Sequence, residues 1–230
     1  MKIKIVVSIL IFVASGMPNT FSQPISDPNT GLKSPETLEI RKIEITPQKT
    51  VVYLIIENRR EGGNFCADKN IVIIYPDGSR VKLINADGIP VCPDAYKFKS
   101  IGEKLAFTLT FPPLKPGTEW VDIIEDCADN CFYLFGVTLN QVLNKRLDEA
   151  FILAASATPE KNLLMFRNIL ESVDDQNTGI EGTLYINVIT AAVESGDKVE
   201  GSVWYKRLLS SRAPRLSEYV KYLNDRGIKF

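Results

Sequence analysis

Four cysteines are the residues of this 230-residue chain that are best suited to chemistry. Cys127 and Cys131 lie four positions apart in IIEDCADNCFYLF, among acidic residues and ahead of an apolar run, whereas Cys66 and Cys92 lie farther upstream. Thiols in such positions form disulfides, bind zinc or carry out thiol–disulfide exchange. The residues around them favour the first of these chemistries.

The spacing of the cysteines predicts two structural disulfides. Cys66 and Cys92 lie on either side of a predicted hairpin, and Cys127 and Cys131 flank a short predicted turn. Residues that face each other across such turns reach the Cα separation that a disulfide requires. We therefore predict the pairs Cys66–Cys92 and Cys127–Cys131.

The other two chemistries fit these cysteines less well. Redox thiols need electropositive neighbours that lower the thiol pKa, but Glu125, Asp126 and Asp129 surround Cys127 and Cys131. A thiol–disulfide oxidoreductase that uses these two cysteines is nevertheless the enzyme alternative. A four-cysteine zinc site requires two close pairs, and positions 66 and 92 are too far apart for one. We predict no catalytic residue, no metal and no cofactor.

The chain contains no histidine, and this absence narrows the possible activities. Nucleophilic sites that pair serine or cysteine with histidine, and metal centres built on imidazole, are excluded. The stretch DDQNTG at 174–179 is similar to the start of a calcium loop. Because Tyr185 stands where that loop requires a bidentate glutamate, we interpret the stretch as a connection between helices.

The first 22 residues have the pattern of an export signal. Lys2 and Lys4 precede an apolar run of about a dozen residues, which is shorter than the ~20 residues that cross a bilayer as a helix. Cleavage after Ser22 is predicted, with Gly16 as the competing site and an uncleaved anchor as the alternative reading. We therefore expect an exported protein without a transmembrane segment in the mature chain.

Residues 23–139 divide into a leader and a β domain. Residues 23–36 are rich in Pro, Ser, Asn and Gly and predict a flexible leader. From 37 to 139 the apolar residues alternate with period two, and strands are predicted at 38–45, 50–58, 105–111, 120–126 and 131–139. Residues 71–84 predict a hairpin that turns at 76–79. Seven or eight short strands indicate an antiparallel β-sandwich of immunoglobulin-like type.

Residues 140–230 change to the helical period. Helices are predicted at 141–155, from Pro159 onward, at 180–195, from Lys198 onward and at 214–226. The segment 180–195 is apolar nearly all round, which predicts a helix buried among the others. The predicted fold class is thus α+β with two domains, the second made of helical hairpins.

Two segments resemble known families. FPPLKPGTEWVDIIE (111–125) followed by FYLFGVTL (132–139) resembles late strands of a β-sandwich in uncharacterised exported bacterial proteins, in some of which a thioredoxin-like domain follows. No such domain follows here. The helical part is similar to tetratricopeptide repeats, through Tyr185, Val188, Ala192, Gly201, Tyr205 and Leu208. It departs from them at Ile189, where the repeat has a small residue. This resemblance implies a surface for protein contacts.

The charge distribution suggests where a partner binds. The net charge of −1 gives no argument for nucleic acid as a partner. Residues 198–230 hold 8 basic and 3 acidic residues, in contrast to 5 and 14 at 121–200. We expect a non-catalytic protein of the bacterial cell envelope that binds a protein partner. The candidate contact residues are Lys206, Arg207, Arg212, Arg215 and Lys221. A carbohydrate-binding module is a further alternative, which predicts an exposed strip of aromatic side chains.

Overall fold

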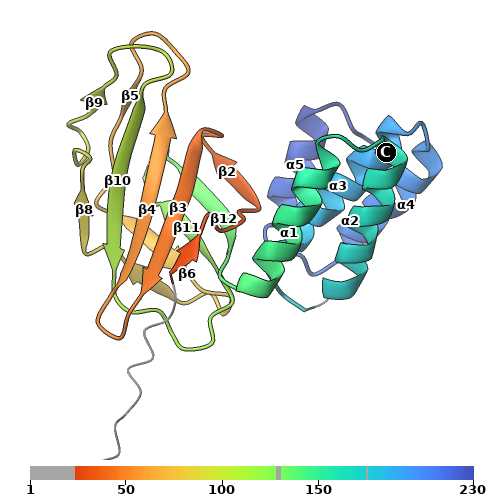
Figure 1. Cartoon of the computed structure of the whole chain (residues 1–230), viewed down its shortest axis with the longest axis horizontal. Coiled ribbons are helices and arrows are strands. Elements are labelled where there is room, and N and C mark those ends of the chain that lie inside the picture. The colour runs from red at the N-terminus through yellow and green to blue at the C-terminus, as the bar shows by residue number, and fades with distance from the viewer. Residues whose placement is uncertain (1–23, 128–130, 175) are drawn as a thin grey trace, which may run out of the picture.

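The computed structural model describes residues 24–127, 131–174 and 176–230. Within these ranges antiparallel sheets precede the helices, so the fold class is α+β (Figure 1). The predicted export signal at 1–22 lies outside the described residues.

Two antiparallel sheets build the β part. Their strand orders are β1-β3-β4-β10-β8 and β2-β12-β11-β6-β7, and β5 pairs with β9 in a small third sheet. The bounds are β1 (Ile25–Ser26), β2 (Leu32–Ser34), β3 (Leu38–Ile45), β4 (Thr50–Glu57), β5 (Asn64–Phe65), β6 (Ile71–Ile74), β7 (Arg80–Lys82), β8 (Asn85–Asp87), β9 (Tyr96–Lys97), β10 (Lys104–Phe111), β11 (Trp120–Glu125) and β12 (Tyr133–Thr138).

Side-chain alternation explains why the two large sheets pack face to face. In β10, Leu105, Phe107 and Leu109 point to one side and are buried, while the residues between them are more exposed. They share one hydrophobic core with Ile123 of β11 and Leu134 of β12, from the other sheet. Successive strand residues point to opposite faces, so this period-two pattern buries one face of each sheet. The predicted sandwich and the predicted 71–84 hairpin (β6–β7) are both present.

The segment 23–36 differs from the expected flexible leader, because it adds one short strand to each large sheet. Ile25 in β1 pairs with Ile43 of β3 and is 5% exposed. Leu32 in β2 pairs with Phe135 of β12 and packs against the helical core. The Pro- and Gly-rich composition concealed these strands, which are too short to show a period of their own.

Five helices follow the sandwich in the described part of the chain. They are α1 (Gln141–Ala154), α2 (Pro159–Val173), α3 (Glu181–Glu194), α4 (Lys198–Ser210) and α5 (Leu216–Asp225). The helix α3 packs against α2, α4 and α5, and most of its residues are buried, as its sequence predicts. Asp197 caps α4 by accepting a hydrogen bond from the Glu200 amide. None of the helices in the described ranges has the length and apolar content needed to span a bilayer.

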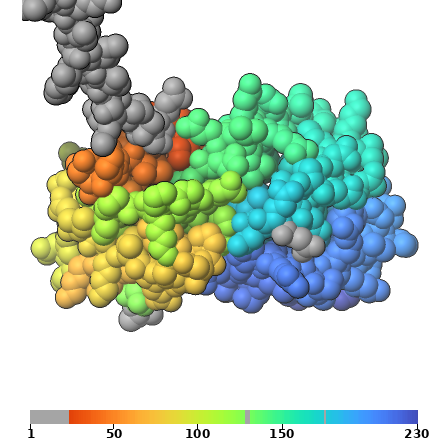
Figure 2. Space-filling model, turned by 90° about the horizontal axis from the view of Figure 1, so that it is seen from below, coloured from red at the N-terminus to blue at the C-terminus, as the bar shows by residue number. Residues whose placement is uncertain are grey.

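The helices lie directly against the sandwich, and Figure 2 shows an unbroken boundary between them. The indole Nε1 of Trp120 donates a hydrogen bond of 2.6 Å to the carbonyl of Asn177, in the α2–α3 connection. A Cβ atom on Gly136 would lie 2.1 Å from the carbonyl oxygen of Gly179, and one on Gly179 would lie 2.6 Å from the Trp120 ring. Only glycine permits so close an approach of two backbones.

Polar contacts reinforce this interface. The side-chain oxygen of Asn144 in α1 accepts hydrogen bonds from the backbone and side-chain nitrogens of Asn29, at 2.8 and 3.1 Å. In addition, Arg215 at the start of α5 forms an ion pair with the buried Asp122 of β11. The two hydrophobic cores are therefore joined by specific contacts that begin in the segment before β2.

Candidate functional site

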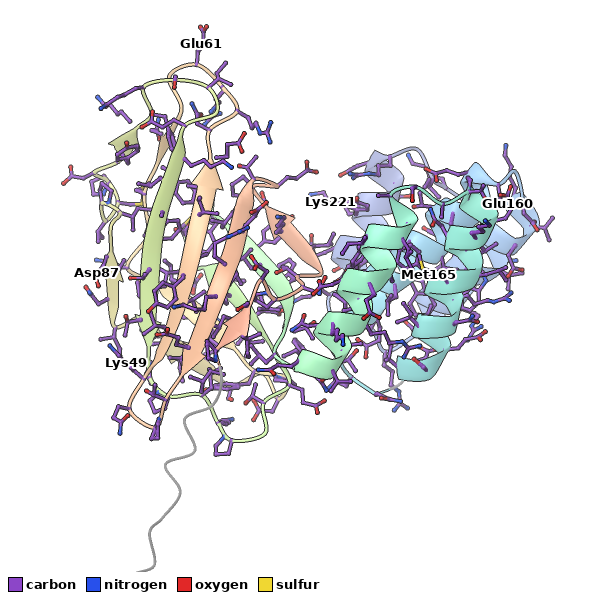
Figure 3. The ribbon with its side chains drawn as sticks, viewed as in Figure 1. Lys49, Glu61, Asp87, Glu160, Met165 and Lys221 are labelled. Atoms are coloured by element: carbon purple, nitrogen blue, oxygen red, sulfur yellow. A yellow bond between two sulfur atoms is a disulfide. The ribbon has the colours of Figure 1, made fainter. Side chains whose placement is uncertain are left out.

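The largest described cavity, of about 950 Å³, lies at one end of the sandwich. We call it the disulfide cavity. It is lined by Ser34, Pro35, Glu36, Thr37, Ile56, Glu57, Asn58, Arg59, Arg60, Gly63, Asn64, Phe65, Cys66, Asp68, Cys92, Phe98, Glu125, Cys127 and Cys131. These residues belong to the β2–β3 turn, the segment after β4, the β9 region and the segments around β11. Figure 3 places Glu61 at the tip of the loop after β4, which forms part of this wall.

Both disulfides form part of the wall of this cavity. The structure confirms the predicted pairs: Cys66 and Cys92 have Cα atoms 5.3 Å apart, and those of Cys127 and Cys131 are 5.7 Å apart. Two intramolecular disulfides indicate an oxidising, extracytoplasmic environment. Their sequence positions did not reveal that the two bonds meet at one site. The turn at 128–130 lies outside the described residues.

Glu125 connects the two disulfide-bearing segments. Its Oε1 accepts a hydrogen bond of 3.0 Å from the amide of Asp68, and its Oε2 accepts one of 2.9 Å from the amide of Phe132. Asp68 follows Cys66 by two positions, and Phe132 is next to Cys131. Burial raises the pKa of the Glu125 carboxyl group above its ordinary value, although the two amide hydrogen bonds oppose the shift.

The remaining walls combine an apolar floor with a charged rim. Ile56 and Phe98 are buried, and the buried side chain of Asn58 donates hydrogen bonds of 2.8 Å to the carbonyls of Arg60 and Ser100. The side chains of Arg59 and Arg60 lie on the exposed rim. Sequence patterns gave no signal for these residues, because they come together only through the pairing of distant strands.

A smaller hollow of about 410 Å³ continues the disulfide cavity onto the outer face of the sheet that contains β3 and β4. The two hollows share Glu36, Thr37, Glu57 and Arg59. Together they form an extended depression rather than a single round pocket. An extended depression suits a chain-like ligand better than a compact one.

The five cations predicted to bind a partner do not act as one set. Arg215 contacts Asp122, with guanidinium nitrogens 2.8 Å from a carboxylate oxygen. Arg207 lies over the Trp204 ring, 4.0 Å from its centre, and 3.5 Å from Asp174. These two side chains therefore have internal roles.

The other three predicted cations lie on separate elements. Lys206 is exposed on α4, Arg212 on the connection before α5 and Lys221 on α5. Figure 3 shows Lys221 on the sandwich side of the helices, opposite Glu160. The structure therefore does not bring the predicted basic face together.

Two further expectations can be compared with the described residues. Trp120 and Trp204 are 4% and 2% exposed, so neither contributes to an aromatic surface of the kind that binds sugars. Within the described ranges, no three acidic, cysteine or histidine side chains are grouped so that they could hold a metal ion.

Comparison with known proteins adds no assignment to this geometry. No protein-family model matches the chain, and no curated protein matches it with significant similarity.

Proposed function

We propose that this protein is an exported, non-catalytic binding protein of the bacterial cell envelope, and that the disulfide cavity holds a segment of a protein partner. The construction of the cavity is the observation that carries the proposal. Loops at the end of a rigid sandwich are frequent binding sites, and two disulfides fix these loops before a ligand arrives. The volume of about 950 Å³ lies at the upper end of the range for ligand sites.

The charges of the cavity favour a basic segment. Four carboxylates line it, from Glu36, Glu57, Asp68 and Glu125, against the two guanidinium groups of Arg59 and Arg60. Glu57 and Arg59 pair with each other at 3.2 Å, which leaves three acids and one cation. Complementary charge increases the rate of encounter and selects among partners. An extended segment with lysine or arginine and one apolar side chain for the floor at Phe98 fits this arrangement.

A cavity-filling substitution tests the proposal. Asn64 lies on the exposed rim of the cavity, and Asn64→Trp places a large side chain there. Asn168→Trp, on the exposed side of α2, is the matched control. Extended peptides displayed as a library are selected on the native protein, and the affinities of the selected peptides are measured by fluorescence polarisation.

The proposal expects selected peptides to be enriched in basic residues and to lose binding to Asn64→Trp alone. Peptides that bind both variants equally, or a library without any enrichment, would contradict it.

The second candidate is a thiol–disulfide oxidoreductase that uses Cys127 and Cys131. One observation favours it: this disulfide lines the open cavity beside Glu125, a carboxyl group with a raised pKa that could accept a thiol proton. A reduction potential below about −300 mV marks a structural disulfide, and a much higher value would favour catalysis.

We also propose that the sandwich is immunoglobulin-like and that the helices are tetratricopeptide-like hairpins. Two antiparallel sheets around one core support the first assignment, and the central position of α3 supports the second. An experimental structure, compared with both families, tests them.

A further inference from the structure

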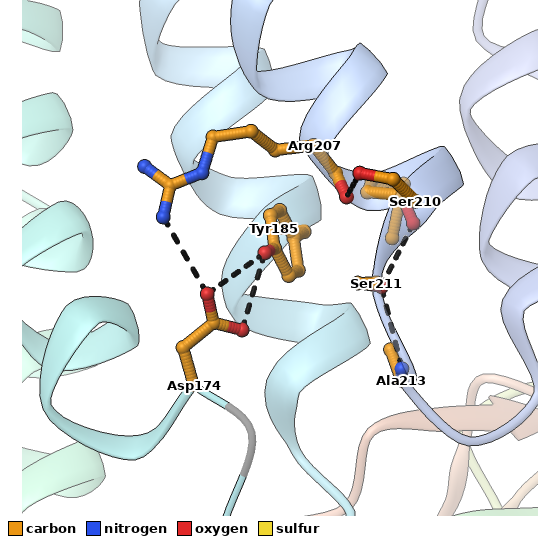
Figure 4. Close-up of polar contacts among 7 residues, drawn as sticks. Asp174, Tyr185, Arg207, Ser210, Ser211 and Ala213 are labelled. Carbon is orange, nitrogen blue, oxygen red and sulfur yellow. Dashed lines mark hydrogen bonds and ion pairs between the residues drawn. The ribbon is translucent and has the colours of Figure 1, made fainter.

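A second cavity, of about 320 Å³, lies among the helices. The α2–α3 connection and the start of α3 contribute Asp174, Asn177 and Glu181, and the α4–α5 connection contributes Arg212 and Ala213. Figure 4 shows Asp174 and Ala213 on these two connections. The disulfide cavity shares none of these residues, so this site is independent of the proposed function.

Glu181 is the feature that points to a ligand. The residue is 3% exposed, and its Oε1 accepts a hydrogen bond from the amide of Thr178. Its Oε2 is buried and has no hydrogen-bond partner in the described part of the chain, and neither has the hydroxyl of Thr178. A buried carboxylate oxygen without a donor is costly, so a donor supplied from outside stabilises it.

The neighbouring acid is already compensated. Both carboxylate oxygens of Asp174 accept from the hydroxyl of Tyr185 at 3.1 Å, and Arg207 lies 3.5 Å away (Figure 4). Arg212 is in the opposite situation to Glu181. Its side chain lines the cavity from an exposed residue, and no ion pair of Arg212 occurs within the described ranges. The cavity thus presents one acceptor that lacks a donor and one cation that lacks an anion.

We propose that this cavity binds a compact zwitterion, a free α-amino acid. The ammonium group donates to Glu181, with Asp174 as a second negative charge, and the carboxylate pairs with the guanidinium of Arg212. Arginine binds a carboxylate through two parallel hydrogen bonds, which fixes the orientation of the ligand. Calcium suits the site less well, because it requires six to eight oxygen ligands and two arginines adjoin these carboxylates.

The protein contains a reporter for this event. Trp120 donates to the carbonyl of Asn177, which lines the cavity, so a ligand that orders this connection changes the fluorescence of the indole. The full-length protein is titrated with each of the common α-amino acids, and with an amine and a carboxylate that lack the other group. Calorimetry measures the same binding without the reporter.

The expected result is saturable binding of one or a few amino acids, and binding at least about tenfold weaker for both single-charge analogues. Glu181→Gln and Arg212→Gln should each weaken binding by a similar factor, whereas the exposed controls Glu160→Gln and Lys229→Gln should not. Arg212→Gln keeps the test valid if Glu181→Gln destabilises α3, because Arg212 is an exposed residue outside the helices. Asn64→Trp should leave this binding unchanged.

Three outcomes would overturn the proposal. One is no binding at millimolar concentrations of any amino acid. Another is binding that Arg212→Gln does not affect. The third is a loss of thermal stability in unliganded Arg212→Gln equal to that in Glu181→Gln, which would make Arg212 the internal partner of Glu181. A calcium titration in parallel identifies a metal site, which also contradicts the proposal.

Discussion

Arg215 and Asp122 form an ion pair between α5 and β11, although 93 residues separate them in sequence. The Nε and Nη2 atoms of Arg215 each lie 2.8 Å from Oδ2 of Asp122, whose side chain is 3% exposed. The other carboxylate oxygen, Oδ1, accepts a hydrogen bond of 2.8 Å from the amide of Gly136. A single carboxylate therefore holds a strand and a helix of different layers together.

Removal of the cation should leave Asp122 as an uncompensated buried charge. We expect Arg215→Asn to lower the free energy of unfolding by about 3 kcal/mol. Asparagine is the appropriate replacement because Arg215 has a φ of +59°, which asparagine tolerates. The double variant Asp122→Asn/Arg215→Asn removes the charge as well and should be more stable than Arg215→Asn. Urea denaturation measures both, and a double variant of equal or lower stability would contradict the expectation.

The contact between Gly136 and Gly179 allows a test with an internal control. Gly136 and Gly62 share a φ of +63°, but a Cβ on Gly62 meets nothing within 4 Å. Gly62→Ala should cost about 1 kcal/mol for the backbone conformation alone. Gly136→Ala should cost about 2 kcal/mol more, because the added atom overlaps the Gly179 carbonyl. Thermal unfolding of the two variants gives the difference, and equal losses would show that the interface opens without cost.

The two disulfides should differ in their contribution to stability. On the chain-entropy model, Cys66→Ala/Cys92→Ala should cost about 3.5 kcal/mol and Cys127→Ala/Cys131→Ala about 2 kcal/mol, because the first bond closes a longer loop. Guanidinium denaturation under non-reducing conditions measures both. A larger loss for the shorter loop would indicate that the 127–131 bond also supports the cavity wall.

Glu125 should give stability a specific pH dependence. Because its pKa is higher in the folded protein than in the unfolded chain, the folded state binds the proton more tightly. This contribution favours folding below the ordinary pKa of 4.5 and is lost as the pH rises through the folded pKa. The stability of the native protein minus that of Glu125→Gln should therefore fall with rising pH from about 4.5 upward. Denaturation from pH 4 to 8 tests this, and a difference that rises with pH would contradict it.

Local patterns were sufficient to predict much of the fold. The alternation in 105–111 predicted a half-buried strand, and the apolar surface of 180–195 predicted the central helix, because both signals depend on neighbouring residues. The strands β1 and β2 left no such signal. Residues 25–26 and 32–34 are held by β3 and β12, and the sequence of a two- or three-residue strand does not show a partner that lies elsewhere.

The candidate sites were less accessible to sequence reasoning. The cysteine spacing predicted the pairs, but the cavity arises from segments that are distant in sequence, between Ser34 and Cys131. The basic face failed because charge counting does not show that Arg207 and Arg215 have acidic partners within the chain. A signal for Glu181 was present: Thr178-x-x-Glu181 matches the capping box, which places such a glutamate at the start of a helix.

The contacts of the segment before β3 determine when the molecule can be completed during synthesis. Residues 25–34 leave the ribosome early, but β2 pairs with β12, and Asn29 binds Asn144 and Asp148 of α1. These partners are made more than a hundred residues later. The first strands of the chain must therefore wait for its second half, and the finished architecture closes from its beginning only when synthesis is well advanced.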